Sequence, residues 1–433
     1  MKDKTKELLE DVARAFKQGM LPAKVFNEPD IFELENERIF KRTWVFLAHE
    51  SEIPNAGDYV LRYIVHDSFI VVRDGEGEIR VLFNTCRHRG SQVCRADMGN
   101  ASHFLCAYHG WSYKNTGDLV GVPHQQRIYG ENFDKSRWGL MQISRVELYQ
   151  GLIFGNLDSD APSLNEYIGG ARWYFDFYTK KSKAGLEVVG APQRWVVPAD
   201  WKLGADNFIG DAYHTSITHR SMVEAGILFA ENADFHLEGP QWVTERAGGG
   251  LMPIPPGSYA GYPPTIAESW KRNMLPEQWR VVEELNLLPT HATLFPNLSF
   301  LNAASLPEMG PPVPWFTIRQ WRPLGPGKIE IWSWFLVEKD LPEEFKQASR
   351  KSYVLSFGVS GTGEQDDTEN WSSISRVAKG ELSRELYLNY QMGLDHVKPM
   401  SDWPGPGQVY PIDYTEYAQR QFWKTWIEFM LAA

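Results

Sequence analysis

The 433-residue sequence predicts an α+β fold with two consecutive domains, and three observations support this prediction. Residues 58–84 alternate apolar and polar side chains as half-buried strands do, which indicates a β-rich first half. The second half mixes strand-like with helical stretches, and a helical apolar period marks both ends of the chain. The length is typical of two or three domains, each with a buried core.

Residues 1–39 predict a helical segment, which we expect to pack on the second domain. Leu8, Leu9, Val12 and Phe16 recur at helical spacing in a charged context. The segment lacks the apolar stretch and cleavage site of a signal peptide, and no run of about 18 apolar residues follows. Three cysteines in so long a chain make no disulfide framework, so we expect a cytoplasmic protein without a membrane partner.

Residues 40–157 predict a compact β domain. The segments "DYVLRYIV" and "SFIVVRDGEGEIRVLF" read as strands, with a hairpin turn at 74–77. The linker "DSDAPSLNEYI" contains a helix start after Pro162–Ser163, which places the domain boundary near 158–163.

Residues 158–433 predict the second domain. The stretches "ATLFPNLSFLNAAS" and "KIEIWSWFLVEKD" indicate antiparallel strands, whereas the Gly/Pro-rich residues 245–265 indicate a mobile loop. The final segment "YAQRQFWKTWIEFML" predicts an amphipathic helix. Its apolar stripe consists of Phe422, Trp423, Trp426, Ile427 and Met430.

The amino-acid composition indicates which classes of partner the protein can bind. The net charge of −11 argues against duplex nucleic acid, which requires clustered Lys and Arg. Seventeen tryptophans and 13% aromatic residues favour large aromatic cores or an apolar pocket.

Two short motifs contain all three cysteines, in "NTCRHRGSQVC" and "CAYHGWSY". Cys86 and His88 form one pair, and Cys106 and His109 form the other, so each pair offers one thiolate and one imidazole. A zinc site usually places two cysteines in one motif and two histidines in the other. Mixed pairs suit a [2Fe–2S] cluster in which each pair spans both irons, with two Cys on one iron and two His on the other. The remaining Cys94 is expected to be structural.

With these motifs the sequence resembles the Rieske non-haem iron oxygenases, in particular the large (alpha) subunit of bacterial aromatic-ring-hydroxylating dioxygenases. Respiratory-chain Rieske proteins match less well, because they have an extra cysteine in each motif and a membrane anchor. The resemblance covers nearly the whole chain, and it implies an all-β Rieske domain followed by a catalytic domain whose antiparallel sheet is wrapped by helices.

A second cluster lies in "ADNFIGDAYHTSITHR". On a continuous helix Asn207, Asp211 and His214 would share one face, but His219 would point about 140° away from His214. The helix is therefore expected to end, or to widen into a π-bulge, between the two histidines. Non-haem iron sites add one carboxylate to two histidines.

The sequence offers four carboxylates for that third position, in "GTGEQDDTENW": Glu364, Asp366, Asp367 and Glu369. Spacing does not choose among them. The resemblance implies that Asp367 is the third ligand of a mononuclear iron.

The resemblance also implies the reaction and the partners. It implies a terminal oxygenase that adds both atoms of dioxygen to an arene to give a cis-dihydrodiol, with NADH electrons arriving through a separate reductase and ferredoxin. It implies α3 or α3β3 assembly with a small (beta) subunit. Asp211 and Asn207 take catalytic roles, Asp211 as a bridge from His214 to His109 of the neighbouring subunit.

The resemblance places the substrate pocket near Asn207, Phe208, Phe357 and Gly363. A bulky tryptophan stands at the position of Gly363 in naphthalene-type members, so we expect a locally larger pocket and an apolar mono- or polycyclic arene. Three alternatives remain open. One is an aromatic carboxylate held by Arg220, another is monooxygenation or demethylation, and the third is an electron-transfer protein without oxygenase activity.

Overall fold

The structure, a computed structural model, describes residues 3–228, 239–306 and 310–432, and it divides into two compact units. The small unit comprises Phe40–Leu164, and the large unit comprises Met1–Ile39 together with Asn165–Ala433. No helix in the described ranges is long and apolar enough to cross a membrane.

The small unit is built from three antiparallel sheets, ordered β5-β4-β3-β6, β10-β11-β2 and β7-β8-β9. The predicted strands of residues 58–84 are confirmed, with Asp74 accepting bonds from Glu76 and Glu78 within the hairpin turn. The elements are β2 (Val45–His49), β3 (Asp58–Ile64), β4 (Asp67–Arg73), β5 (Ile79–Phe83), β6 (Met98–Asn100), β7 (His103–Leu105), β8 (Ser112–Lys114), β9 (Leu119–Gly121), α3 (Gln125–Tyr129), β10 (Arg145–Tyr149) and β11 (Leu152–Asn156).

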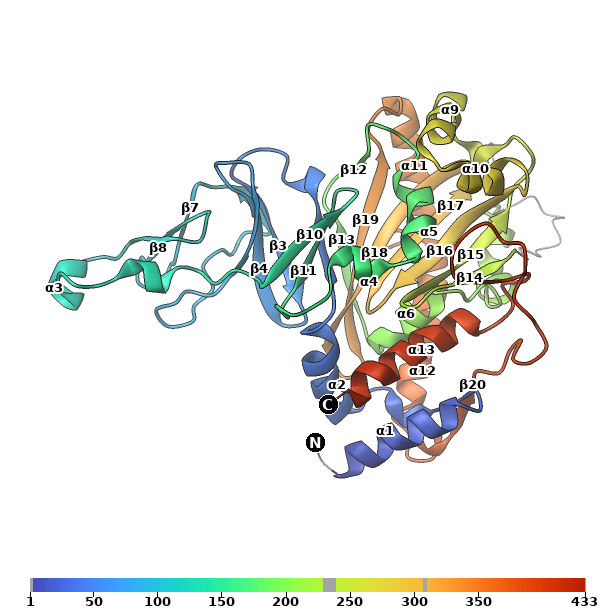
Figure 1. The fold of residues 1–433 in the computed structure, drawn as a ribbon, viewed down its shortest axis with the longest axis horizontal. Helices are drawn as coiled ribbons and strands as arrows, with labels where there is room; N and C mark the ends of the chain where they lie inside the picture. The colour runs from blue at the N-terminus through green and yellow to red at the C-terminus, as the bar shows by residue number, and fades with distance from the viewer. Residues whose placement is uncertain (1–2, 229–238, 307–309, 433) are drawn as a thin grey trace. The chain divides into compact units, whose positions relative to one another are not determined.

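The large unit is organised around a nine-stranded antiparallel sheet, ordered β12-β19-β18-β17-β16-β15-β14-β21, with β13 also paired to β19 (Figure 1). The two antiparallel regions expected from the sequence are confirmed as the β16–β17 hairpin and as β19. The strands are β12 (Leu186–Val188), β13 (Gln193–Val197), β14 (Gln241–Val243), β15 (Ala247–Pro253), β16 (Leu287–Leu294), β17 (Leu298–Ser305), β18 (Val313–Gly325), β19 (Lys328–Glu338) and β21 (Gln408–Tyr410), and β1 (Met20–Pro22) pairs separately with β20 (Tyr387–Asn389).

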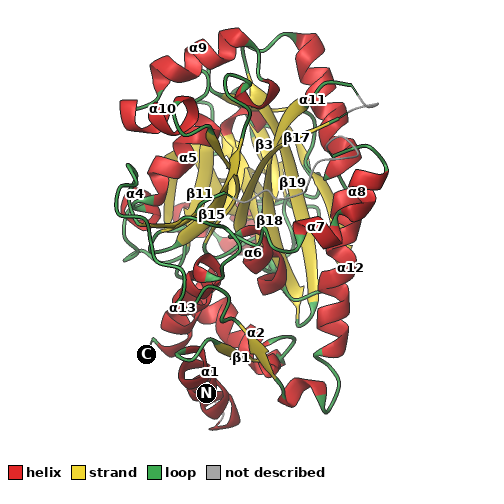
Figure 2. Ribbon diagram, turned by 90° about the vertical axis from the view of Figure 1, so that its right-hand side faces the viewer, coloured by secondary structure: helices red, strands yellow, loops and turns green. Residues whose placement is uncertain are grey.

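Helices surround this sheet, as expected, and α7 and α8 lie beside α12 (Figure 2). The helix α6 contacts β16, β17 and β18, so it is held directly on the sheet. The helices are α1 (Asp3–Phe16), α2 (Pro29–Glu35), α4 (Leu164–Ile168, which begins at the unit boundary), α5 (Ala171–Thr179), α6 (Trp201–Phe208), α7 (Thr215–Thr218), α8 (Arg220–Glu224), α9 (Pro264–Asn273), α10 (Pro276–Glu283), α11 (Glu343–Ser356), α12 (Thr362–Val377) and α13 (Tyr417–Leu431).

The two ends of the chain meet in the large unit. Phe422, Trp423, Trp426 and Met430 of α13 are buried, as the apolar stripe predicts, and Ile427 is half-buried. Glu35 of α2 accepts bonds from Lys202 Nζ at 2.7 Å and Trp426 Nε1 at 2.8 Å, and all three side chains are buried. This pairing satisfies a buried charge, which would otherwise be costly.

The mobile loop predicted for residues 245–265 is wrong for residues 247–253, and residues 254–263 connect β15 to α9 without a strand or an α-helix. Residues Ala247–Pro253 form β15, paired on both sides by β14 and β16, and α9 begins at Pro264. The glycines serve close packing, because a Cβ at Gly249 would lie 2.3 Å from the carbonyl oxygen of His291, and one at Gly248 would lie 2.8 Å from Ala418 Cβ.

Candidate functional site

The two Cys/His motifs of the small unit fold into matching turns. The N–H of Gly90 donates to the carbonyl of Cys86, and the N–H of Gly110 donates to the carbonyl of Cys106, both at 2.9 Å. Both glycines have a positive φ, +74° and +71°, which a residue with a side chain adopts only at a cost. A glycine four residues after each cysteine therefore shapes the turn that presents one sulfur and one imidazole.

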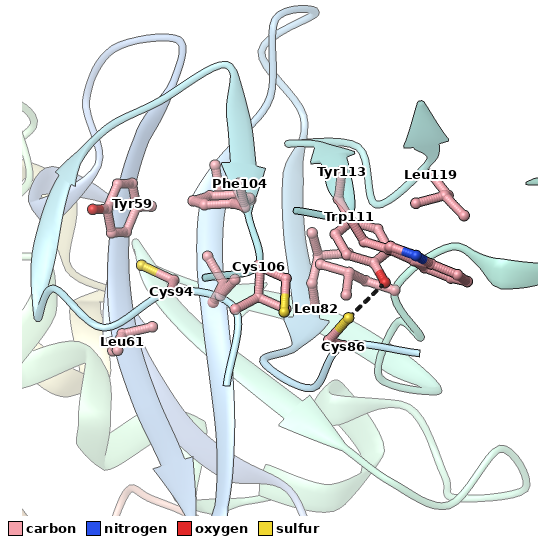
Figure 3. Close-up of a cluster of buried hydrophobic side chains, with 14 residues drawn as sticks. Tyr59, Leu61, Leu82, Cys86, Cys94, Phe104, Cys106, Trp111, Tyr113 and Leu119 are labelled. Atoms are coloured by element: carbon pink, nitrogen blue, oxygen red, sulfur yellow. Dashed lines mark hydrogen bonds between the residues drawn. The ribbon is translucent and has the colours of Figure 1, made fainter. Parts of the chain in front are cut away.

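The sulfurs point inward and the imidazoles outward. Cys86 and Cys106 are 2% exposed and lie in the apolar core cluster of this unit (Figure 3), whereas His88 is half-buried and His109 is exposed. The Nδ1 atoms of His88 and His109 are 3.1 Å apart. Two imidazole nitrogens facing one point and two neighbouring buried sulfurs fit the donor set of a [2Fe–2S] cluster with two His on one iron.

The surroundings favour a neutral His88 imidazole and place a hydroxyl donor beside the sulfur of Cys86. Burial, the nearby His109 and Arg89 lower the pKa of His88. The hydroxyl of Tyr113 accepts the N–H of Arg87 at 3.1 Å, so its own proton is free for the sulfur of Cys86, 3.3 Å away (Figure 3). Cys94 is also buried in this core, and its thiol points to the carbonyl oxygen of Ala96 at 3.6 Å, in keeping with a structural role.

In the large unit, the helix that carries Asn207 ends earlier than predicted. The expectation of one helical face through His214 is wrong, because α6 ends at Phe208. The carbonyl of Gly210, which would accept the N–H of His214 in a continuous helix, accepts the side chain of Gln241 at 2.9 Å instead. The backbone N–H of His214 donates to Asp211 Oδ1 at 3.3 Å.

The helix end expected between the two histidines is confirmed, because α7 ends at Thr218 and His219 has a ψ of 21°. Both histidines can therefore face one point. His214 and His219 flank the single helical turn α7, and Asp367 projects from α12. The two Nε2 atoms are 3.3 Å apart, and each lies 3.4 Å from Asp367 Oδ1. Three ligands at bonds of about 2 Å to one octahedral metal would lie about 3 Å apart, so this triangle could hold a metal ion with positions left open.

A second carboxylate stands behind each histidine. Asp211 Oδ2 lies 3.3 Å from Nδ1 of His214, and Asp366 Oδ2 lies 3.5 Å from Nδ1 of His219. Such partners keep the proton on Nδ1 and direct the Nε2 lone pair to the metal. Burial opposes a charge on His214, but Asp211 outweighs it and raises the pKa of His214 well above its ordinary value. The role of Asp366 was not predicted, although the adjacent pair Asp366–Asp367 was visible in the sequence.

The triangle opens on an apolar cavity of about 180 Å³. Asn207, Phe208 and Phe357 line it, as expected, together with His291. Asn207 Nδ2 also lies 3.3 Å from both Asp211 Oδ2 and His214 Nδ1, so it touches the outer hydrogen bonds of the site. The other lining residues are largely apolar, among them Leu228, Met252, Leu301, Ala303, Leu306 and Pro312.

Two pocket expectations are wrong. Gly363 is not among the lining residues that the structure describes, and a Cβ there would lie 2.7 Å from Met222 Sδ and from Phe357 Cζ. Those two side chains fill the space that we expected to enlarge the pocket. Arg220 is also no carboxylate anchor, since its side chain is 76% exposed and its Nε donates to Glu224 at 2.9 Å.

Comparison with known proteins identifies the class. Residues 43–140 match the family described as Rieske [2Fe-2S] domain, and residues 164–431 match the catalytic domain of the ring hydroxylating alpha subunit. The chain therefore belongs to the ring-hydroxylating alpha subunits, oxidoreductases with a Rieske [2Fe–2S] cluster and a non-haem iron. An electron-transfer protein without a catalytic domain is thereby excluded.

Three particular relatives show how far the similarity extends. The chain is 49% identical to naphthalene 1,2-dioxygenase from Rhodococcus sp. bound to indole, with a TM-score of 0.94 over 100% of this chain and 99% of that one. It is 38% identical to the biphenyl 2,3-dioxygenase alpha subunit of Rhodococcus jostii over 95% of this chain and 89% of the relative. It is 36% identical to an N,N-dimethyl phenylurea N-demethylase alpha subunit of Sphingobium sp. over 98% and 94%.

Proposed function

We propose that the chain is the terminal oxygenase subunit of an arene cis-dihydroxylating system. The observation that carries the proposal is the triangle of His214, His219 and Asp367, which opens on an apolar cavity with Phe208 and Phe357 as aromatic walls. These three residues would hold the iron, and Cys86, His88, Cys106 and His109 would hold the [2Fe–2S] cluster. When bound, the cluster supplies single electrons and the ferrous ion activates dioxygen.

The protein itself orients the ring and excludes water. Apolar walls hold the arene beside the open face of the triangle and keep the reacting atoms dry. In the overall reaction the O–O bond breaks and two neighbouring ring carbons each gain one C–O bond, with two electrons and two protons completing the balance. The electrons come from NADH through a partner reductase and ferredoxin.

Asp211 is the proposed electron bridge. Its carboxylate contacts His214 Nδ1, yet its side chain remains 32% exposed and so can reach a partner. His109 is exposed on the small unit. We propose that Asp211 of one subunit hydrogen-bonds His109 of the next in an α3 or α3β3 assembly. The exposed Tyr213, 59% accessible beside Asp211, offers contact surface there. A reducing cytoplasm suits the three free cysteines.

The substrate class follows from the relatives and the cavity. The dioxygenase relatives are named for biphenyl and naphthalene, and the cavity walls are apolar. No Lys or Arg occurs among the described lining residues, which disfavours an aromatic carboxylate. A second candidate is N-demethylation, because the relative from Sphingobium sp. is named as an N-demethylase subunit.

A single-turnover experiment separates these activities. The purified protein, loaded with both metals and chemically reduced, is exposed to ¹⁸O₂ with naphthalene, biphenyl, benzene or N,N-dimethyl phenylurea. The proposal predicts a cis-dihydrodiol that carries two labelled oxygens from one O₂ molecule. Formaldehyde from the phenylurea, without diol from any arene, would support the demethylase instead.

A further inference from the structure

A buried arginine of the central sheet reaches the elements that form the cavity. Arg319 lies on β18 and is 0% exposed. Its Nη1 donates to Glu364 in the first turn of α12, and its Nη2 donates to the carbonyl of Phe357 at 2.6 Å. One guanidinium thus joins the C-terminal end of α11 to the first turn of α12 and spans the turn between these helices.

Glu364 connects this arginine to the iron site. Glu364 stands three residues before Asp367, so both side chains project from the same side of α12, and both are buried. Burial raises the pKa of Glu364 to about 7, and the nearby Arg319 opposes this rise. The geometry, and not the protonation state, joins the two side chains. The rotation of α12 about its axis, which aims Asp367, is therefore tied to the sheet.

The same guanidinium lies against both aromatic walls. Its Cζ is 5.1 Å from the ring centre of Phe208 and 5.5 Å from that of Phe357. These are cation–π distances in a dry environment, where such contacts are strongest. Phe208 belongs to α6 and Phe357 lies at the end of α11. The guanidinium therefore connects two walls that are far apart in the sequence.

We propose that the buried pair Arg319–Glu364 is a positioning device that sets the two phenylalanine walls relative to Asp367 and thereby decides which ring carbons are oxidised. The pair touches neither the substrate cavity nor the three iron-binding atoms, so it acts through Phe208, Phe357 and Asp367. A forked guanidinium suits this task because it makes two directed bonds at once, whereas a lysine offers a single point charge.

The test uses two variants of the pair in the full chain and one control. Arg319→Lys keeps the charge but removes the fork. Arg319→Met with Glu364→Met removes both charges and leaves no unpaired ion, an exchange that buried pairs often tolerate. The control replaces the buried pair Lys181–Glu338, whose Nζ–Oε1 distance is 3.6 Å, by two methionines in the same unit.

Two properties are measured. The first is the affinity of the apo-protein for Fe(II) alone, obtained by competition with a chelator, which needs no substrate. The second is the ratio of 2,3- to 3,4-diol from biphenyl at equal iron loading. We expect both pair variants to lose about tenfold in Fe(II) affinity and to shift the diol ratio by about threefold or more, and the control to keep both values.

The product ratio rests on the proposed arene oxidation, whereas the metal affinity does not. If wild-type protein makes no diol from any arene, the proposed function fails and the Fe(II) affinity alone decides the role of the pair. Wild-type values in either readout for both pair variants would overturn the positioning role. So would failure of both pair variants to fold when the methionine control folds, because the pair would then act in folding.

Discussion

The hydroxyl of Tyr113 lies 3.3 Å from the sulfur of Cys86, and the N–H of Arg87 donates to the same hydroxyl. Because the hydroxyl already accepts from the backbone, it donates to the sulfur. A hydrogen bond to a thiolate ligand stabilises the electron-rich, reduced form of an iron–sulfur cluster more than the oxidised form.

Tyr113→Phe should therefore lower the reduction potential of the cluster. Loss of about 1 kcal/mol of hydrogen bonding to the reduced form corresponds to about 40 mV for one electron. A redox titration followed by EPR measures the shift. Tyr59→Phe, in the same core but beside Cys94, is the control. An unchanged potential in the Tyr113 variant would mean that the hydroxyl does not donate to the cluster.

Asp366→Ala should weaken iron binding without affecting the Rieske cluster. Asp366 accepts from His219 Nδ1 and from Ser221 Oγ, the latter at 2.7 Å, so its loss frees the imidazole to rotate. Loss of such an outer carboxylate typically lowers the metal affinity by about 10- to 100-fold. Fe(II) titration of the apo-protein measures it, with the exposed Glu369→Ala on the same helix as control. Equal affinities for the two variants would contradict this assignment.

His291 should make the large unit less stable as the pH falls. Burial, and then the nearby His214, lower the pKa of His291 from 6.5 to about 4, with Asp211 opposing. Between these pH values the unfolded chain binds the proton and the folded chain does not, so the free energy of unfolding decreases as pH falls from 6.5 towards 4. The full penalty is on the order of 3 kcal/mol.

Denaturant unfolding at several pH values measures this slope. His291→Gln should flatten it between pH 6.5 and 4, and the exposed His396→Gln in the same unit should leave it unchanged. A slope that persists in full in the His291 variant would show that other groups cause it.

Gly363→Trp should shrink the cavity. The space around Gly363 already holds Met222 and Phe357, so a large side chain must push Phe357 towards the substrate. Overpacking of this kind costs about 1–3 kcal/mol. We expect kcat/KM for biphenyl to fall by about tenfold relative to that for benzene. The added change Met222→Ala should recover part of the loss, and a variant that prefers biphenyl more strongly would contradict the packing argument.

Local spacing indicated the two Cys/His motifs, whereas the choice of Asp367 as third iron ligand came from the resemblance. Cys86 and Cys106 each begin a turn closed by a glycine four residues later, so the sequence itself contains the geometry. The strands of residues 58–84 were predictable for the same reason, since an alternating pattern and a glycine turn are local signals.

Contacts between distant segments explain the errors. At the early end of α6, the side chain of Gln241 donates to the carbonyl of Gly210. Gln241 is remote from Gly210 in the sequence, so no local pattern could have indicated this contact. The glycines of β15 looked flexible because their close neighbours, His291 and Ala418, are remote in sequence. The pocket at Gly363 was misjudged in the same way, because Met222 comes from another helix.

The most direct test of the account is the transfer of electrons from the cluster to the iron in Asp211→Ala. Protein loaded with both metals is reduced, mixed with O₂ and naphthalene, and followed by the visible absorbance of the cluster and by product analysis. Because Asp211 also supports His214, the variant is loaded with excess Fe(II) until its iron content and EPR signal equal those of the wild type. We predict that cluster re-oxidation and diol formation then slow by about 100-fold or more. Re-oxidation and product formation at nearly the wild-type rate would contradict the bridging role of Asp211.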